Sequence, residues 1–356
     1  MSHAIAKNEA GQFLCAYRGE RPWHAAETKP IMVPDDQPDS ALFVAGGFDA
    51  RIRRAKVRYP VNPADANNPA AWATMDDKHV LLSDASGDPR PIGIVSDRFK
   101  IVQPRAFRDL AERLCGALGG RTVACFTLHG GAGLVAVIEA GESIRIVGSD
   151  IVKPFSTLST RNDGTDPTRI TGGTFRPDCA NMLAMALADH GKSATDMTLS
   201  HRLEFDPARL ASYWGAKLVQ YQLQAEQCRM LAQTGVSLKV GERFVFDLFN
   251  DRRSEANRQD PDRPVGAGRR DIHNSVGYKT VLGLFAGAGR GMNKPGVKGT
   301  AWGMLNAVTE YVDHHAQAAS ASHRFESAAT GAGAALKATA FDWLVALADG
   351  SAAIDA

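Results

Sequence analysis

The sequence predicts an α+β protein, with an antiparallel β-rich N-terminal half that contains embedded helices and a helical C-terminal half. Two observations support this prediction. Short β-branched runs, separated by Gly, Asn and Asp turns, recur between residues 50 and 205. From residue 206 onward, apolar residues recur at helical spacing instead. Strands first and helices later are typical of an α+β architecture and not of alternating βα units.

The β-rich half contains one clear helix among its strands. Pro104 opens this helix, its apolar residues fall at helical spacing to residue 118, and Gly119-Gly120 ends it. Before it we expect a weak strand, a short apolar run and a hairpin, at 51–59, 79–82 and 91–102. After it we expect a glycine-turned hairpin, three further strands and a helix, at 122–128 with 134–140, then 144–147, 155–160, 168–175 and 178–189.

The helical half begins at Asp206-Pro207, a favourable N-cap and first-turn pair. The apolar spacing predicts helices at 207–233, 241–249, 276–285, 300–315 and 338–347. A charged, proline-bearing loop is expected at 251–271.

Composition sets the expected domain boundaries. Four prolines before residue 40 interrupt any helix, so we expect an irregular N-terminal arm over 1–49. Residues 50–315 are expected to form a single compact domain, β-rich over 50–205 and helical over 206–315. Residues 316–356, rich in Ala, Ser and Gly, are expected to form a C-terminal tail.

Several classes of protein are disfavoured by the sequence. No run of 18 apolar residues occurs, so we expect no membrane-spanning helix. The N-terminus has no secretory h-region, and the five cysteines are scattered without a C-x-x-C pair. We therefore expect a cytoplasmic protein with reduced cysteines, no bound metal and no cofactor.

Catalytic motifs are not supported by their context. The His129-Gly130-Gly131 turn occurs without a G-x-S-x-G elbow, and residues 291–300 lack the contiguous Gly-Lys-Ser/Thr of a phosphate loop. His314-His315 has no partner at metal-ligand spacing. An enzyme is therefore disfavoured. The third and weakest hypothesis is a site assembled only in space, from Asn162, Asp163, Asp178 and Asn181.

Four segments resemble a known family. They are Arg21-Pro22-Trp23-His24, residues 97–103 (DRFKIVQ), residues 158–183 (LSTRNDGTDPTRITGGTFRPDCANML) and residues 300–314 (TAWGMLNAVTEYVDH). The chain resembles the phage/plasmid-like protein family, a domain of unknown function carried on phages, prophages and plasmids. It departs from that family at Arg161, where a small residue is usual, and at Pro104, where Asn is frequent. The resemblance implies a genomic context and no reaction.

Two functions from different classes remain. The order of helix, antiparallel strands and helix over 104–189 is similar to the core of the phage annealing proteins, the RecT and Red-beta group. This favours a DNA-binding protein of the single-strand annealing or recombination type, with single-stranded DNA as partner and self-association into a homo-oligomer as a further expectation. The alternative is a non-catalytic interaction or inhibitor protein of a mobile element that acts on a host protein.

Basic residues supply the expected DNA-binding site. A polyanion is attracted by Arg and Lys gathered where acids are scarce. The loop 287–299 holds three cations, no acid and few apolar side chains, so we expect it to be mobile in the free protein and to order on a phosphate backbone. A continuous positive groove of Arg161, Arg169 and Lys298 would favour DNA binding. The complete set of expected contacts is Arg51, Arg53, Arg54, Lys56, Arg58, Arg161, Arg169, Arg176, Arg290, Lys294 and Lys298.

Overall fold

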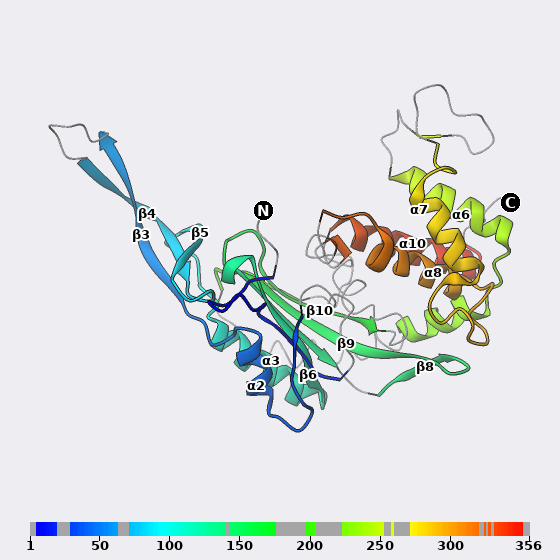
Figure 1. Ribbon diagram of the computed structural model, residues 1–356, viewed down its shortest axis with the longest axis horizontal. Coiled ribbons are helices and arrows are strands. Elements are labelled where there is room, and N and C mark those ends of the chain that lie inside the picture. Colours follow the sequence, from blue (N-terminus) through cyan, green and yellow to red (C-terminus); the bar gives the residue numbers. More distant parts are fainter. Residues whose placement is uncertain are drawn as a thin grey trace.

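The computed structural model describes residues 5–19, 29–62, 71–139, 142–175, 197–203, 223–252, 258–259, 271–319, 324, 327–328 and 331–351. Its strands lie mostly in the N-terminal half and its helices mostly in the C-terminal half, which confirms the α+β prediction. Figure 1 shows three parts along the longest axis: a projecting two-stranded ribbon, a large sheet and a group of helices. The predicted helix at 178–189 lies outside the described residues.

The large sheet is ordered β11-β10-β9-β7-β6-β1-β2, with β8 paired to β9. All its pairings are antiparallel except that of β1 with β2. Its strands are β1 (Cys15–Tyr17), β2 (Ile31–Met32), β6 (Arg121–Leu128), β7 (Gly133–Glu139), β8 (Ile144–Val147), β9 (Asp150–Arg161), β10 (Thr168–Phe175) and β11 (Met197–Leu199). A short 3-10 turn, η1 (His129–Gly131), connects β6 to β7.

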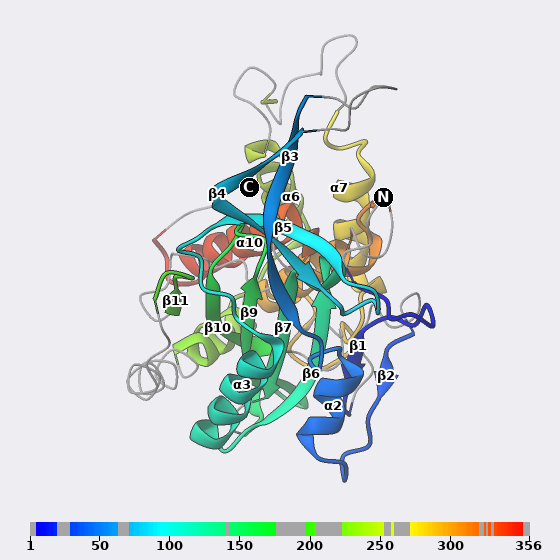
Figure 2. The same ribbon diagram turned by 90° about the vertical axis from the view of Figure 1, so that its left-hand side faces the viewer.

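Two helices, α2 (Asp39–Ala45) and α3 (Pro104–Leu118), cover one face of this sheet (Figure 2). The predicted bounds of α3 agree with the structure. Pro104 occupies the first turn, and Gly119 ends the helix in the left-handed conformation with φ 57°. Phe107 and Leu114 of α3 are fully buried against the sheet. The apolar face that the sequence pattern predicts is therefore the face that packs on the sheet.

The N-terminal segment differs from the irregular arm expected for 1–49. Its strand β1 pairs with β6 in the large sheet, and Cys15 and Ala16 are fully buried. Phe43 of α2 is also fully buried, and Pro38 stands at the N-cap of that helix. Pro30, Pro34 and Pro38 therefore flank the short elements of this segment and do not prevent them.

Among the described residues, the helical half contains α6 (Leu238–Asp251), α7 (Val276–Gly283), α8 (Ala301–Glu310) and α10 (Ala332–Ala348), with π-helical turns η4 (Leu284–Ala288) and η5 (Tyr311–His315). The helices predicted at 241–249, 276–285 and 300–315 are present, and of the one predicted at 207–233 the described residues 223–233 are helical. The C-terminal helix is longer than expected. Leu336, Ala340 and Leu344, four residues apart, are buried in the helical core, so α10 is anchored where a tail was predicted.

Strand β9 connects the two halves. Val152 of β9 belongs to the core of the helical half, whereas Phe155 and Leu158 belong to the two cores on opposite faces of the sheet. The buried Asp150 accepts a hydrogen bond of 2.6 Å from Nε1 of Trp302 in α8. The predicted single domain over 50–315 stays a prediction, to which this shared strand lends support.

The small sheet is ordered β3-β4-β5, with β3 (Ile52–Asn62), β4 (Ala71–Ser83) and β5 (Arg90–Ser96). Strand β5 pairs only with residues 78–83 of β4. The ribbon formed by β3 and β4 beyond β5 therefore has two strands only, and it projects away from the large sheet (Figure 1). From here on we call β3 and β4 together the arm; this name does not refer to the irregular N-terminal arm expected for residues 1–49. In the described part of the chain, no helix has the length and apolar character needed to cross a membrane.

Candidate nucleic-acid interface

The far part of the arm exposes large apolar side chains. The exposed fractions are 46% for Tyr59, 57% for Val61, 55% for Trp72 and 40% for Met75. A two-stranded ribbon without a covering layer has no core in which to bury such side chains. Exposed apolar groups gathered on one projecting element are typical of a binding surface.

The strand register places an aromatic ring and a cation together on one face of the arm. Arg58 is paired with Thr74 and Pro60 with Trp72, and residues that oppose one another across two strands share a face. The guanidinium of Arg58 accordingly lies 6.0 Å from the centre of the Trp72 ring. Tyr59, paired with Ala73, lies on the other face. Both faces of the ribbon thus carry an aromatic ring.

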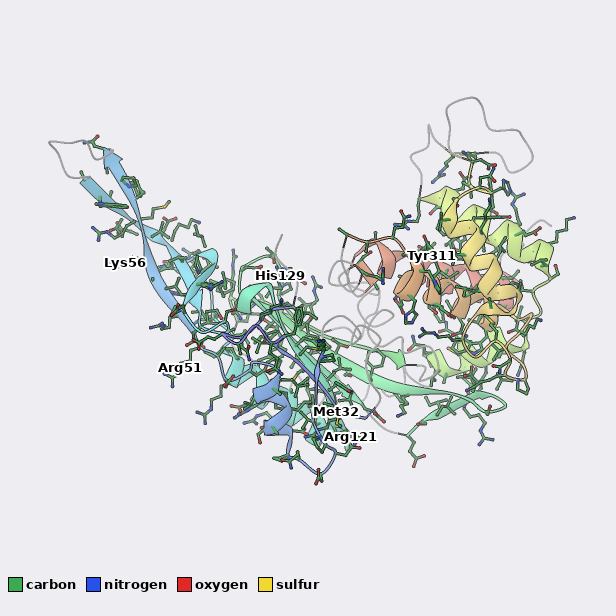
Figure 3. All side chains as sticks on the ribbon, in the orientation of Figure 1. Met32, Arg51, Lys56, Arg121, His129 and Tyr311 are labelled. Carbon is green, nitrogen blue, oxygen red and sulfur yellow. The ribbon has the colours of Figure 1, made fainter. Side chains whose placement is uncertain are left out.

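The five basic residues predicted at 51–58 are all exposed on the arm or at its base, and Figure 3 shows Arg51 and Lys56 at two positions along it. Arg54 differs from the others, because its guanidinium donates to the carbonyl oxygens of Asp97 and Phe99. Within the described part of the chain, Arg53, Lys56 and Arg58 make no ion pair. The carboxylate of Asp77, an acid of β4, lies 3.9 Å from the ammonium group of Lys78 instead. Three cations of the arm are therefore available to an anionic partner.

An open pocket of about 540 Å³ lies where the arm meets the large sheet, and we call it the basal pocket. Its lining residues are Arg54, Asp97, Arg98, Phe99, Lys100, Ile101 and Arg202. Four of these residues are cations and one is an acid. Such an excess of positive charge in a concave surface attracts anions.

The wall of the basal pocket is held in place by His201. The His201 ring stacks on Phe99 with 4.5 Å between ring centres, and its Nδ1 lies 2.9 Å from the carbonyl oxygen of Lys100. The backbone N–H of Lys100 donates in return to the carbonyl oxygen of His201, at 2.6 Å. These contacts fix the segment that carries Arg98 and Lys100.

The Asn-Asp-Gly turn at 162–164 has a structural role in this corner. The fully buried side chain of Asn162 donates to the carbonyl oxygen of Val102 and accepts from its N–H, both at 3.0 Å. A Cβ added at Gly93 of β5 would lie 2.7 Å from Cα of Asp163, so the arm base packs tightly on this turn. The amide of Asn162 is thus occupied by backbone contacts. Asp178 and Asn181, which completed the weakest catalytic hypothesis, lie outside the described residues.

Arg161 and Arg169 are paired with acids of the same turn. Arg161 contacts Asp163 through its Nε and Nη2 atoms, and Arg169 contacts Asp166 at 2.7 Å. Burial raises the pKa of Asp163, but hydrogen bonds from Arg161 and Thr165 outweigh it and hold the pKa below its usual value. These two arginines are therefore less available to DNA than the cations of the arm.

The loop 287–299 is anchored, contrary to the expectation of a mobile segment. Met292 and Val297 are 1% and 0% exposed in the core of the helical half. Nζ of Lys294 lies 3.6 Å from the buried Asp150, and the backbone N–H of Arg290 donates to Glu310 at 2.7 Å. Two apolar side chains of the loop and two acids distant in the sequence hold it in place. The acids are not visible from its local composition.

The structure places the loop that carries Lys298 and the residue Arg161 near opposite ends of β9, which argues against a continuous groove of Arg161, Arg169 and Lys298. A Cβ added at Gly296 would meet the side chain of Val147, so the loop lies beside the start of β9. Arg161 is the last residue of that strand of 12 residues, which spans roughly 40 Å at about 3.3 Å per residue. Arg176 lies outside the described residues. The structure gathers the cations of the arm and the basal pocket, and it separates the cations of the loop from them.

Several residues of this surface were not among the DNA-binding residues predicted from the sequence. Arg98, Lys100 and Arg202 line the basal pocket, and Tyr59 and Trp72 provide the exposed rings. The Arg-Phe-Lys run at 98–100 was a usable signal. No local pattern links that run to Arg202, because the chain folds back between them through the large sheet.

Neither a metal centre nor a reactive thiol is apparent among the described residues. They contain no group of three or more His, Cys, Asp or Glu side chains arranged to hold a metal ion. Cys15, Cys115, Cys125 and Cys228 are buried free thiols. Burial raises the pKa of Cys115 to about 11 and that of Cys228 to about 12.

The fold and this surface define an α+β protein with a projecting basic β-ribbon and a cationic pocket at its base. Residues 91–330 match the family described as a domain of unknown function, DUF932. The match covers more than half of the chain, and the protein belongs to this family. Comparison with curated proteins and with solved structures gives no match.

Proposed function

We propose that this protein binds single-stranded DNA through the arm, as an annealing or recombination protein of a phage or plasmid. The observation that supports the proposal best is the mixture of Arg53, Lys56 and Arg58 with the exposed rings of Tyr59 and Trp72. Cations along a backbone path and aromatic rings for bases are the two ingredients of sequence-independent single-strand binding.

A single strand fits these ingredients better than a duplex. The bases of a duplex are stacked on one another, so an exposed Trp or Tyr gains a stacking partner only where a strand is open. Each base stacked on an aromatic side chain contributes about 1–3 kcal/mol of binding free energy. The 55% exposed ring of Trp72 beside Arg58 suits a base on the ring and a phosphate on the guanidinium.

The phage or plasmid context comes from the resemblance of four segments to the phage/plasmid-like proteins. On this proposal the protein acts in the cytoplasm, where replicating DNA exposes single strands. Annealing brings two strands together, so the proposal includes self-association of the protein into a homo-oligomer. No catalytic step and no cofactor is part of it.

A second candidate function is that of an interaction protein of a mobile element that docks on a host protein. It is favoured by the exposed apolar side chains of the small sheet, because Val61 is 57% and Ile94 is 62% exposed. Aliphatic side chains contribute little to nucleic-acid binding and are common in protein interfaces. On this alternative the arm would contact a protein through these groups.

Fluorescence anisotropy of labelled oligothymidylate and of a duplex of equal length distinguishes the two functions. The proposal predicts binding of the single strand that is at least tenfold tighter than that of the duplex and that weakens as salt rises. Absence of salt-dependent single-strand binding by the full chain would reject DNA binding and leave the protein-docking alternative.

A further inference from the structure

The basal pocket has features of a phosphate site that go beyond a basic surface. Arg54, Arg98, Lys100 and Arg202 converge on a hollow of about 540 Å³, and among the residues that the structure describes Asp97 is the single acid that lines it. The cations come from three separate stretches of the chain, so the fold assembles them, and local composition does not. The like charges gathered here repel one another at a cost in stability, which a bound anion would offset.

Arg54 is held in a fixed orientation in this pocket. Two of its N–H groups donate to the carbonyl oxygens of Asp97 and Phe99, which leaves other guanidinium donors for a ligand. Because the contacts of His201 with Phe99 and Lys100 hold the segment 97–101, the pocket wall has little freedom to rearrange. Fixed guanidinium groups match the oxygens of a phosphate with several parallel hydrogen bonds.

The charge of the pocket favours a terminal phosphate over an internal one. A phosphate monoester carries close to two negative charges at pH 7, because its second pKa is about 6, whereas a phosphodiester carries one. Four cations against one carboxylate therefore attract a strand end more strongly than a strand interior.

We infer that the basal pocket binds the terminal phosphate of a DNA strand, so that the strand begins at the pocket and continues along the arm. This inference rests on the proposed DNA binding and adds to it a preference for phosphorylated ends. The arm supplies affinity for any single strand, and the pocket supplies discrimination by end chemistry.

The test compares three oligonucleotides of one sequence, with a 5′-phosphate, a 3′-phosphate or hydroxyl groups at both ends. We expect the full chain to bind one of the phosphorylated forms at least about tenfold more tightly than the hydroxyl form. The preference is expected to decrease as pH falls below about 6, where the monoester gains a proton. Replacement of both pocket arginines (Arg98→Gln with Arg202→Gln) is expected to abolish the preference, so that the phosphorylated and hydroxyl forms bind with equal affinity.

The exposed Arg105 and Arg113 of α3 provide the matched control, since Arg105→Gln with Arg113→Gln removes two cations outside the pocket. Arg98 and Arg202 are also exposed, so their replacement is expected to leave the unfolding temperature unchanged. Equal affinity of the unmodified protein for all three oligonucleotides would overturn the inference and leave the proposed function standing. If no oligonucleotide bound, the proposed function would fail, and calorimetry with inorganic pyrophosphate would decide the pocket alone. Binding of pyrophosphate that the paired replacement abolishes would support the site, and absence of binding would overturn it.

Discussion

Removal of the three unpaired cations of the arm gives the most direct measure of its role. The variant replaces Arg53, Lys56 and Arg58 by Gln, which removes the charge and retains much of the side-chain length. Each single-strand phosphate that is neutralised contributes about 0.7 to the slope of log K against log salt. Loss of three such contacts is expected to make this slope shallower by about 2. If the variant and the unmodified protein bind equally at 1 M salt, the variant should therefore bind about 100-fold more weakly at 0.1 M salt.

The assay is a salt titration of oligothymidylate binding, followed by anisotropy, with the unmodified protein alongside. All three side chains are exposed on the arm, so the free energy of unfolding is expected to change by less than about 0.5 kcal/mol. A control variant replaces three exposed cations elsewhere, Arg105, Arg113 and Lys239, and changes the net charge by the same amount. If the control lost as much affinity and slope as the arm variant, binding would depend on overall charge, and the arm would not be the interface.

Four further outcomes are expected. Trp72→Ala is expected to weaken single-strand binding by about 1–3 kcal/mol through lost stacking, with thermal stability retained, and anisotropy together with calorimetry measures both. The lowered pKa of Asp163 stabilises the folded state above the unfolded pKa near 3.8, and this contribution is lost as pH falls through the folded pKa. Urea titrations from pH 7 to pH 2 should therefore show Asp163→Asn destabilised at pH 7 and converging with the unmodified protein in acid. Lys337 and Asp313, both 0% exposed and 2.6 Å apart, form a buried ion pair. Lys337→Met is expected to cost about 3–5 kcal/mol, of which a second change, Asp313→Leu, recovers a large part; urea unfolding that showed no cost would contradict a buried pair. Burial raises the pKa of Cys228 to about 12, so a thiol reagent at pH 8 is expected to modify it only after unfolding, and rapid modification of the native protein at this site would contradict the structure.

Elements with strong local signals were predictable from the sequence. Helix α3 has Pro104 at its start, glycine at its end and apolar residues at helical spacing, and its bounds agree with the structure. The hairpin of β6 and β7 follows from β-branched runs around a glycine turn, where Gly130 and Gly131 have φ of 66° and 105°. These signals act over a few residues, so local propensity and the final fold agree.

Features that depend on distant partners were not predictable in this way. Strand β1 has three residues and becomes a strand because it pairs with β6, about a hundred residues further along the chain. Lys294 and Arg290 lie in a loop without acids, yet the structure supplies Asp150 and Glu310 from elsewhere. The basal pocket is a third case, since Arg54 and Arg202 meet only after the whole sheet has formed. Electrostatic arguments from a local stretch fail when the fold provides the counter-charge.

Strand β9 has a consequence for how the molecule unfolds. Its twelve residues place Val152, Phe155 and Leu158 in three different apolar cores, so one continuous backbone segment belongs to all of them. Melting of the helical half would expose Val152 and leave the buried Asp150 without Trp302, which in turn would loosen the pairing of β9 with β7 and β10. Cooperativity between the halves therefore depends on this strand, together with Ile146 of β8, which lies in the same helical core. Force applied to the helices would be transmitted along β9 to the turn at 162–164, which supports the base of the arm.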